Sequence, residues 1–417
     1  MQRTSAALAA AIAALLASGS AAAQNTPSME EMWRLIQQQQ AEIQALRTEL
    51  EQARQSVRET GQDLAETRQQ VEQTREAVTA ATSEVESLRA SSAGAADWAA
   101  STHLGGYGEL HYNAGKADEI DFHRFVLFFA HRFSDTTRFN SELEVEHTLA
   151  GEGKPGEVEL EQAYIEHDLA PGLRGRAGLF LVPVGLLNEV HEPTTFYGVE
   201  RNPVESQILP TTWWEAGLSL QGEFENGLGW DAAMHSGLAT GAGSHYAVRS
   251  GRKKVAKAPA EDAAYTLRLR YQVPGLQLAA GYQHQSDVTQ GQDPTAGAAD
   301  LFTAHADWSL GRFGLRALWA RWHLDGAGPA AVGADVQKGY YVEPSFRITP
   351  RVGVFARWNE WDNRAGDSAD SRWRQTDVGI NYWLHPNVVL KADYQFQDAP
   401  AGLADDDRLN LGVGYQF

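Results

Sequence analysis

Acidic side chains recur at every second position in two stretches of the sequence. Five carboxylates follow this pattern: Glu142, Glu144, Glu146, Glu159 and Glu161. Side chains two residues apart lie on the same face of an extended strand, so this spacing would line up the carboxylates on one surface. Arg268 and Arg270 have the same spacing and the opposite charge. Facing rows of opposite charge would create a transverse electric field that orders water and disfavours apolar solutes. Alternatively, the acidic face is simply solvated.

Histidines are abundant and lie among carboxylates, a mixture that can bind divalent metal ions. The 13 histidines include His111, His123, His131, His147, His167 and His191. No close pair has a standard ligand spacing, and isolated histidines on a wet surface need no metal, so we predict no metal site. The chain contains no cysteine, no GxSxG motif, no phosphate-binding loop and no HExxH motif. We therefore predict neither an enzyme nor a cofactor.

Strands are the elements that must position these side chains. From about residue 103 onward, segments of about ten residues alternate apolar with polar positions between Gly, Asp, Asn and Pro turns, which is typical of a transmembrane β-barrel. In Ala263–Val273, for example, Leu267 and Leu269 share one face and Arg268 and Arg270 the other. We expect about sixteen antiparallel strands and a water-filled lumen. The expected strands begin near Leu104, Ile120, Arg138, Val158, Leu173, Trp213, Leu228, Ala263, Leu276, Leu301, Phe313, Tyr340, Arg351, Trp373, Val388 and Arg408.

The alternation sorts the charged side chains and the aromatic residues. The carboxylates above would face the lumen, together with the basic residues Arg268, Arg270, Arg351, Arg357, Lys391 and Arg408. Aromatic residues at strand ends would form the two interfacial girdles of a barrel. They are Trp213, Trp214, Trp319, Trp322, Trp358, Trp361, Trp373, Tyr382, Trp383 and Tyr415.

The segment Gly185–Thr212 is a long loop that follows the expected fifth strand. Loops of this length are usually functional or disordered, and this one is rich in Pro, Asn, Glu and aromatic residues, which favours an ordered loop. We expect it to fold into the lumen and to form a constriction. An external loop that contacts a neighbouring subunit or lipopolysaccharide is the alternative. Six of its side chains would narrow the passage: Glu189, His191, Glu192, Glu200, Arg201 and Glu205.

The first 102 residues have a different character. A basic residue, an Ala/Leu-rich run and Ala21–Ala23 predict a signal peptide over residues 1–23. Residues 24–92 carry apolar residues every seventh position, such as Ile36, Ile43 and Leu50, which predicts an α-helical coiled coil. The second core position is small or polar in most heptads, with Leu46 and Leu88 as exceptions, so the helix would need partner chains. A solvated single helix or a disordered spacer is the alternative. Residues 93–102 read as a linker.

The charge balance limits the partners. The formal net charge is −19, and residues 1–96 contain 8 Lys+Arg and 12 Asp+Glu, which leaves 27 and 42 for residues 97–417. An acidic chain repels phosphates, so we predict no nucleic-acid partner. In a pore, the same charge would favour cations.

The region His103–Phe417 resembles the phosphate-selective porin O/P family of bacterial outer-membrane porins. The resemblance rests on Phe122–Phe133, Arg138–His147, Gln162–His167, Gly175–Val184 and the final GVGYQF, in which an alternating strand ends on Phe417. It implies a trimeric pore narrowed by an inward-folded loop, and some members of the family carry an N-terminal coiled coil. Phosphate selectivity in this family depends on rows of Arg and Lys, whereas here acids outnumber bases in the barrel region.

These features together predict an outer-membrane porin for passive diffusion of small hydrophilic solutes or ions, with cations favoured. Its expected partners are outer-membrane lipid, lipopolysaccharide and two further copies in a homotrimer. Two alternatives stay open: an anion- or phosphate-selective porin, and an envelope tether in which a periplasmic coiled coil contacts peptidoglycan.

Overall fold

The structure is a computed structural model that describes residues 67–82, 98–148, 153 and 155–417, together with separate positions between 28 and 55. The chain divides into two units, Met1–Ala95 and Ala96–Phe417. The predicted signal peptide and residues 93–97 of the predicted linker lie outside the described residues. The second half of that linker is a helical turn at residues 98–101, after which the first strand begins at Thr102.

In the N-terminal unit, residues 67–82 are helical and exposed. The heptad residues Val71 and Val78 expose 59% and 60% of their surface. Two apolar side chains one heptad apart form an open stripe, and pairing with another chain would cover it. The coiled coil therefore stays a prediction. None of the described helices is long and apolar enough to cross a membrane.

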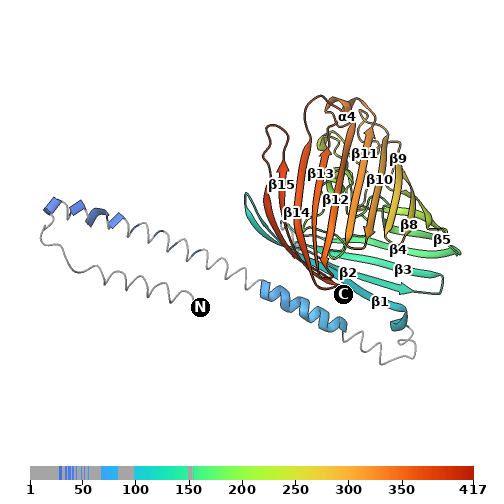
Figure 1. Ribbon diagram of the computed structural model, residues 1–417, viewed down its shortest axis with the longest axis horizontal. Helices are drawn as coiled ribbons and strands as arrows, with labels where there is room; N and C mark the ends of the chain where they lie inside the picture. Colours follow the sequence, from blue (N-terminus) through green and yellow to red (C-terminus); the bar gives the residue numbers. More distant parts are fainter. Residues whose placement is uncertain are drawn as a thin grey trace. The chain divides into compact units, whose positions relative to one another are not determined.

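The C-terminal unit is a closed antiparallel barrel of sixteen strands, as predicted. Each strand pairs with its neighbours in the sequence, and β1 pairs with β16 (Figure 1). Every expected strand start lies within four residues of an observed one. The strands are β1 (Thr102–Ala114), β2 (Asp118–Arg132), β3 (Thr137–Glu146), β4 (Val158–Ala170), β5 (Leu173–Leu181), β6 (Trp214–Glu223), β7 (Leu228–His235), β8 (Ala264–Val273), β9 (Leu276–Gln285), β10 (Ala299–Leu310), β11 (Phe313–Leu324), β12 (Val336–Thr349), β13 (Val352–Asp362), β14 (Trp373–His385), β15 (Val388–Asp398) and β16 (Arg408–Gln416).

The seam between β1 and β16 closes the barrel. The N–H of Gly106 donates to the carbonyl of Phe417 at 2.9 Å, and the N–H of Phe417 donates back to the carbonyl of Gly106 at 2.8 Å. A Cβ at Gly106 would lie 2.2 Å from the carbonyl oxygen of Val126. A larger residue at this position would therefore push β1 away from β2, the strand on its other side, which explains the glycine.

Alternation separates an outer face from an inner face. In β8, Leu267 and Leu269 are 48% and 61% exposed, whereas Thr266 and Arg268 are buried. The exposed apolar residues form the surface that lipid would cover. The aromatic residues follow the same rule, and this corrects part of the predicted girdles. Trp319, Trp358 and Tyr382 lie on the outer face, but five tryptophans are buried inside the barrel: Trp213, Trp214, Trp322, Trp361 and Trp383.

The two ends of the barrel differ. Two-residue turns at 171–172, 274–275, 311–312, 350–351 and 386–387 connect strands at one end, and the long loops lie at the other. Two of these loops, residues 182–213 and 236–263, include short helical turns: η1 (Val204–Ile208), η2 (Ala242–Ser244) and η3 (Val248–Gly251). A further short helix, α4 (Ala327–Ala331), lies between β11 and β12.

Part of the lumen is filled by an apolar core. Val204, Ile208 and Leu209 of the 182–213 loop pack against inward-facing Trp322 and Tyr341, and all five are at most 2% exposed. Burial of a Val, Leu or Ile side chain contributes about 1.5–3 kcal/mol. The loop is thus held in the barrel by the same packing that stabilises the interior of a soluble protein.

Candidate functional site

The loop of residues 182–213, hereafter the lumen loop, crosses the inside of the barrel. It was predicted to fold inward, and its hydrogen bonds reach strands on several sides of the lumen. Three side chains donate hydrogen bonds to its backbone carbonyls: Arg124 of β2 to His191 (2.8 Å), Arg316 of β11 to Thr195 (3.0 Å) and Asn381 of β14 to Phe196 (3.1 Å). In the opposite direction, the N–H of Val199 donates to the carboxylate of Asp393 on β15 (2.6 Å). A segment tied to so many strands is held in place from several directions.

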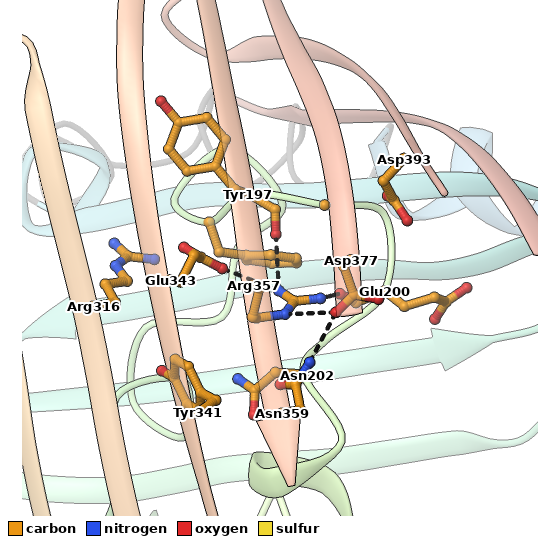
Figure 2. A network of polar contacts seen from close by, with 12 residues as sticks. Tyr197, Glu200, Asn202, Arg316, Tyr341, Glu343, Arg357, Asn359, Asp377 and Asp393 are labelled. Atoms are coloured by element: carbon orange, nitrogen blue, oxygen red, sulfur yellow. Dashed lines mark hydrogen bonds and ion pairs between the residues drawn. The ribbon is translucent and has the colours of Figure 1, made fainter. Parts of the chain in front are cut away.

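Arg357 on β13 makes the densest of these attachments (Figure 2). Its guanidinium donates to the carboxylates of Asp377 (3.0 Å) and Glu343 (3.1 Å), and also to the lumen-loop carbonyls of Tyr197 (3.3 Å) and Glu200 (3.4 Å). The side chain is 3% exposed. Arg357 was predicted as a lumen charge, but here two carboxylates neutralise it and its remaining donors hold the loop.

Glu205 shapes the loop from within. Its carboxylate accepts hydrogen bonds from the N–H groups of Leu186 (2.6 Å) and Leu187 (2.7 Å) and from the hydroxyl of Tyr341 (2.9 Å). The residue is 0% exposed. Buried backbone N–H groups need partners, and Glu205 supplies them. A role of Glu205 in narrowing the passage stays a prediction; in the structure its buried carboxylate holds the loop together.

His191 ties the other arm of the loop to the acidic strands. Its Nε2 lies 3.4 Å from a carboxylate oxygen of Glu142 and 3.6 Å from one of Glu161. Burial alone would lower the pKa of His191, but these two carboxylates raise it to about 9. His191 is thus an imidazolium at neutral pH and completes an ion-pair cluster.

Two cavities in the described part of the lumen are bounded by the lumen loop. One, of about 740 Å³, opens between the loop end of the barrel and the lumen-loop residues Glu200, Arg201 and Pro203. The other, of about 260 Å³, lies at the end with the short turns and is bounded by lumen-loop residues Thr195 and Tyr197. The lumen loop therefore separates two compartments with polar linings.

The larger cavity has an acidic wall formed by β3 and β4. Its carboxylates are Glu144, Glu146, Glu159 and Glu161. The alternation of these residues places all of them on the inner face, opposite outward Leu143 and Leu160. Lys254 pairs with Glu159, and Arg124 lies 3.8 Å from Glu144.

Three arginines from two loops line the same cavity. Arg201 bonds the hydroxyl of Thr212 at 2.7 Å, Arg249 bonds the carbonyl of Ser206 at 2.6 Å, and Arg252 bonds the carbonyl of Thr212. Among the described residues, none of the three has a carboxylate partner. Burial, together with the charges of Arg252 and Arg201, lowers the pKa of Arg249 to about 10. Neighbouring positive charges thus add up beside the acidic wall.

The predicted site residues fall into two groups. The residues that line the larger cavity are Glu144, Glu146, Glu159, Glu161, Glu200, Arg201 and Arg408. The remaining ones lie elsewhere, engaged in attachments or buried: Glu142, Glu189, His191, Glu192, Glu205, Arg268, Arg270, Arg357 and Lys391. Arg268 and Arg270 both pair with Asp231, at 2.8 and 3.2 Å, and Arg268 also pairs with Glu189. The expected partners of the acidic row are therefore neutralised locally.

The sequence interpretation missed the bases that do face the acidic wall. Arg249, Arg252 and Lys254 come from the β7–β8 loop, which was not singled out. A signal was present, because Arg249–Lys257 is a compact basic stretch in an otherwise acidic chain. Arg124 and His111, which line the same cavity, come from strands whose inward positions the alternation could have identified.

Comparison with known proteins agrees with this geometry. Residues 219–416 match the family described as Gram-negative porin. An uncharacterized protein of Aquifex aeolicus (strain VF5) is 28% identical over 357 residues, covering 75% of this chain and 79% of the relative. The phosphate-selective O/P assignment is not confirmed by these matches and stays a prediction.

Solved structures share the barrel. An anion-selective porin from Comamonas acidovorans is 13% identical with a TM-score of 0.52, over 76% of this chain and 99% of that one. A loop L8 deletion mutant of OmpT, an outer membrane protein of Vibrio cholerae, is 11% identical with a TM-score of 0.53, over 76% and 99%. At these identities the likeness concerns the fold. The chain thus has a porin-like sixteen-strand barrel whose C-terminal part matches Gram-negative porins.

Proposed function

We propose that this protein is an outer-membrane channel through which small hydrophilic solutes and ions diffuse passively, with a weak preference for cations. The observation that carries the proposal is the 740 Å³ cavity inside a closed barrel, lined by charged groups and bounded by an anchored loop. Its walls offer carboxylates and guanidinium groups, which suit hydrated solutes and disfavour apolar ones. Transport rather than catalysis is the function that this arrangement supports.

The preference for cations is weak because the two cavities are nearly balanced. The larger one is lined by eight carboxylates and six Arg or Lys side chains, and the smaller one by two carboxylates and three arginines. Most of the barrel unit's excess of acids therefore lies outside these cavities. The acidic wall, together with Arg201, Arg249 and Arg252, would produce the transverse electric field expected from the sequence.

A second candidate is an anion-selective channel, which could include phosphate among its solutes. It is favoured by Arg201, Arg249 and Arg252, whose guanidinium groups have no carboxylate partner among the described residues. An anion entering the cavity could pair with them without breaking an ion pair.

A homotrimer in the outer membrane is the assembly we propose. An outer membrane protein of Vibrio cholerae with a similar barrel, at 10% identity and a TM-score of 0.52, is described in a trimer form. Exposed apolar residues on the outer face provide the surface for lipid or for neighbouring subunits. The N-terminal unit would then lie in the periplasm.

The test is the reversal potential of the purified protein in a planar bilayer under a KCl gradient. We expect a small cation-selective potential, a larger one for the triple variant R201Q/R249Q/R252Q, and a shift toward anions for E144Q/E146Q/E159Q. R372Q, on an exposed loop arginine outside the cavity lining, is the matched control and should leave the potential unchanged. A strongly anion-selective wild type would establish the second candidate, and the absence of any conductance would refute both.

A further inference from the structure

Three histidines gather on the wall of the larger cavity, although no two of them are close in the sequence. His111, His123 and His147 all line it. The strand register brings them together: His111 pairs with Asp121 across β1 and β2, and the N–H of His147 donates to the carbonyl of His123 at 3.1 Å. His147 lies just beyond β3 with a positive φ of 48°, which turns the chain there.

We propose that Asp121, His123 and His147 form a binding site for a divalent transition-metal ion such as Zn²⁺. The Nδ1 of His123 lies 3.2 Å from a carboxylate oxygen of Asp121, and the Nδ1 of His147 lies 2.8 Å from the same carboxylate. One ligand atom from each of the three residues lies within 4.8 Å of the other two. Ligands bound tetrahedrally at roughly 2.0–2.1 Å from Zn²⁺ are about 3.3 Å apart, which is close to the two imidazole–carboxylate distances.

The donor set selects the class of ion. Two imidazole nitrogens and one carboxylate suit Zn²⁺, Co²⁺, Ni²⁺ or Cu²⁺, whereas Mg²⁺ and Ca²⁺ prefer oxygen ligands. Three protein ligands leave a coordination position for water or a solute. The side chains of Asp121, His123 and His147 are 21%, 33% and 32% exposed, so an ion from solution can reach them.

Neighbouring residues orient the ligands of this site and set its electrostatic potential. The ring of His111 stacks on that of His123, with centroids 4.7 Å apart and planes at 13°. His111 is itself fixed by Glu109 at 3.2 Å and Glu200 at 3.3 Å, so it supports the site without being free to ligate. Glu119 and Glu146 act on His147 electrostatically, and their negative charge favours a dication.

A second histidine–aspartate pair provides a matched control. His284 Nδ1 lies 2.8 Å from Asp300, nearly the distance found for His147 and Asp121. It lies on the outer face, since its neighbours Gln283 and Leu301 are buried inside. Among the residues that the structure describes, no second imidazole joins it in a group of three donors. Comparison of the two pairs separates a chelating site from an ordinary hydrogen bond between imidazole and carboxylate.

The test is Zn²⁺ titration of the tag-free, metal-stripped, folded protein in detergent by isothermal titration calorimetry. We expect one Zn²⁺ per chain, binding at least about tenfold weaker in H123N and in H147N, and binding unchanged in H284N. Circular dichroism of each variant checks that the barrel is folded. The absorption spectrum of added Co²⁺ should report nitrogen ligands in the wild type and not in H123N/H147N.

Three results would overturn the proposal. The first is equal Zn²⁺ binding by the wild type and H123N/H147N, and the second is a loss of Zn²⁺ binding in H284N equal to that in H123N and H147N. The third is a loss of Zn²⁺ binding in H191N with none in H123N or H147N. The last would place the ion at Glu142, Glu161 and His191, the buried group described above. Because the measurement needs no current, its outcome is independent of the proposed channel function.

Discussion

The two inner walls of the barrel are built on different principles. On the side of β10–β13, inward Leu301, Leu318, Trp322 and Tyr341 meet the lumen loop in an apolar core. On the side of β1–β4, many inward positions are Glu, His and Arg, and a cavity remains. The β10–β13 wall thus holds the lumen loop by apolar packing, while the β1–β4 wall holds it by polar contacts and leaves room for a cavity. A barrel can therefore use the same alternating strands either to bind its own chain or to face solvent, depending only on which residues point inward.

The largest effect should come from breaking the polar attachment on the packed side. Replacement of Arg357 by Leu leaves the buried carboxylates of Asp377 and Glu343 without their counter-ion, and we expect a loss of about 3–5 kcal/mol in the stability of the folded state. The release of the carbonyls of Tyr197 and Glu200 should also raise single-channel conductance. Denaturant unfolding followed by circular dichroism, together with bilayer recordings, measures both. R372Q serves as the control, and a stable R357L variant with wild-type conductance would contradict this role.

The second-largest effect should come from substitutions in the apolar core, where the loss of stability should increase with the side-chain volume removed. Ile208 is 0% exposed, and Ile208→Ala should destabilise the protein by about 2–5 kcal/mol, while Ile208→Val should cost about 0.5–1.5 kcal/mol. Conductance should rise in the same order, because a loosened loop obstructs less of the lumen. If I208A conducts like the wild type, the core contributes to stability without defining the passage.

The smallest effect should appear as a pH dependence on the wet side. The folded-state pKa of His191 is about 9, above the ordinary value of 6.5, so the ion pairs with Glu142 and Glu161 contribute fully below pH 6.5 and are lost as pH rises through 9. The difference corresponds to at most about 3 kcal/mol. The groups facing the ring also include Tyr107 and Arg201. Conductance noise from loop motion should increase between pH 7 and 10 in the wild type. H191Q should be noisy at every pH, and a pH response retained in H191Q would assign it to another group.

Strand positions were predictable because each strand carries its own alternating pattern. The same pattern could have sorted the tryptophans. Trp319 and Trp322 are three residues apart, so in one strand they must face opposite sides, and Trp322 is indeed inside. The roles of charged loop residues were not predictable in this way. Glu205 serves N–H groups of Leu186 and Leu187, nearly twenty residues away, and no local spacing encodes that contact.

The histidine cluster is another feature that the sequence alone did not predict. His123 and His147 are far apart in the chain, so a search for close ligand pairs passes over them, and only the register of β2 and β3 brings them together. The bases of the cavity wall were missed for a related reason, because loops have no alternation from which to read direction. Local sequence patterns therefore predict the strands of the barrel wall. The arrangement of the side chains and loops inside the lumen depends on contacts between residues far apart in the sequence.

The seam between β1 and β16 has a consequence for how the molecule forms. Tyr107 pairs with Gln416, so the closing ladder joins residues 309 positions apart. Until that ladder forms, both edge strands present unpaired N–H and C=O groups, which invite pairing with other chains. The entropic cost of bringing such distant segments together slows closure. During assembly, the edge strands of the incomplete sheet must therefore be kept from pairing with other chains until all sixteen strands are present. A chain that lacks one strand would leave an edge strand of the sheet without its partner.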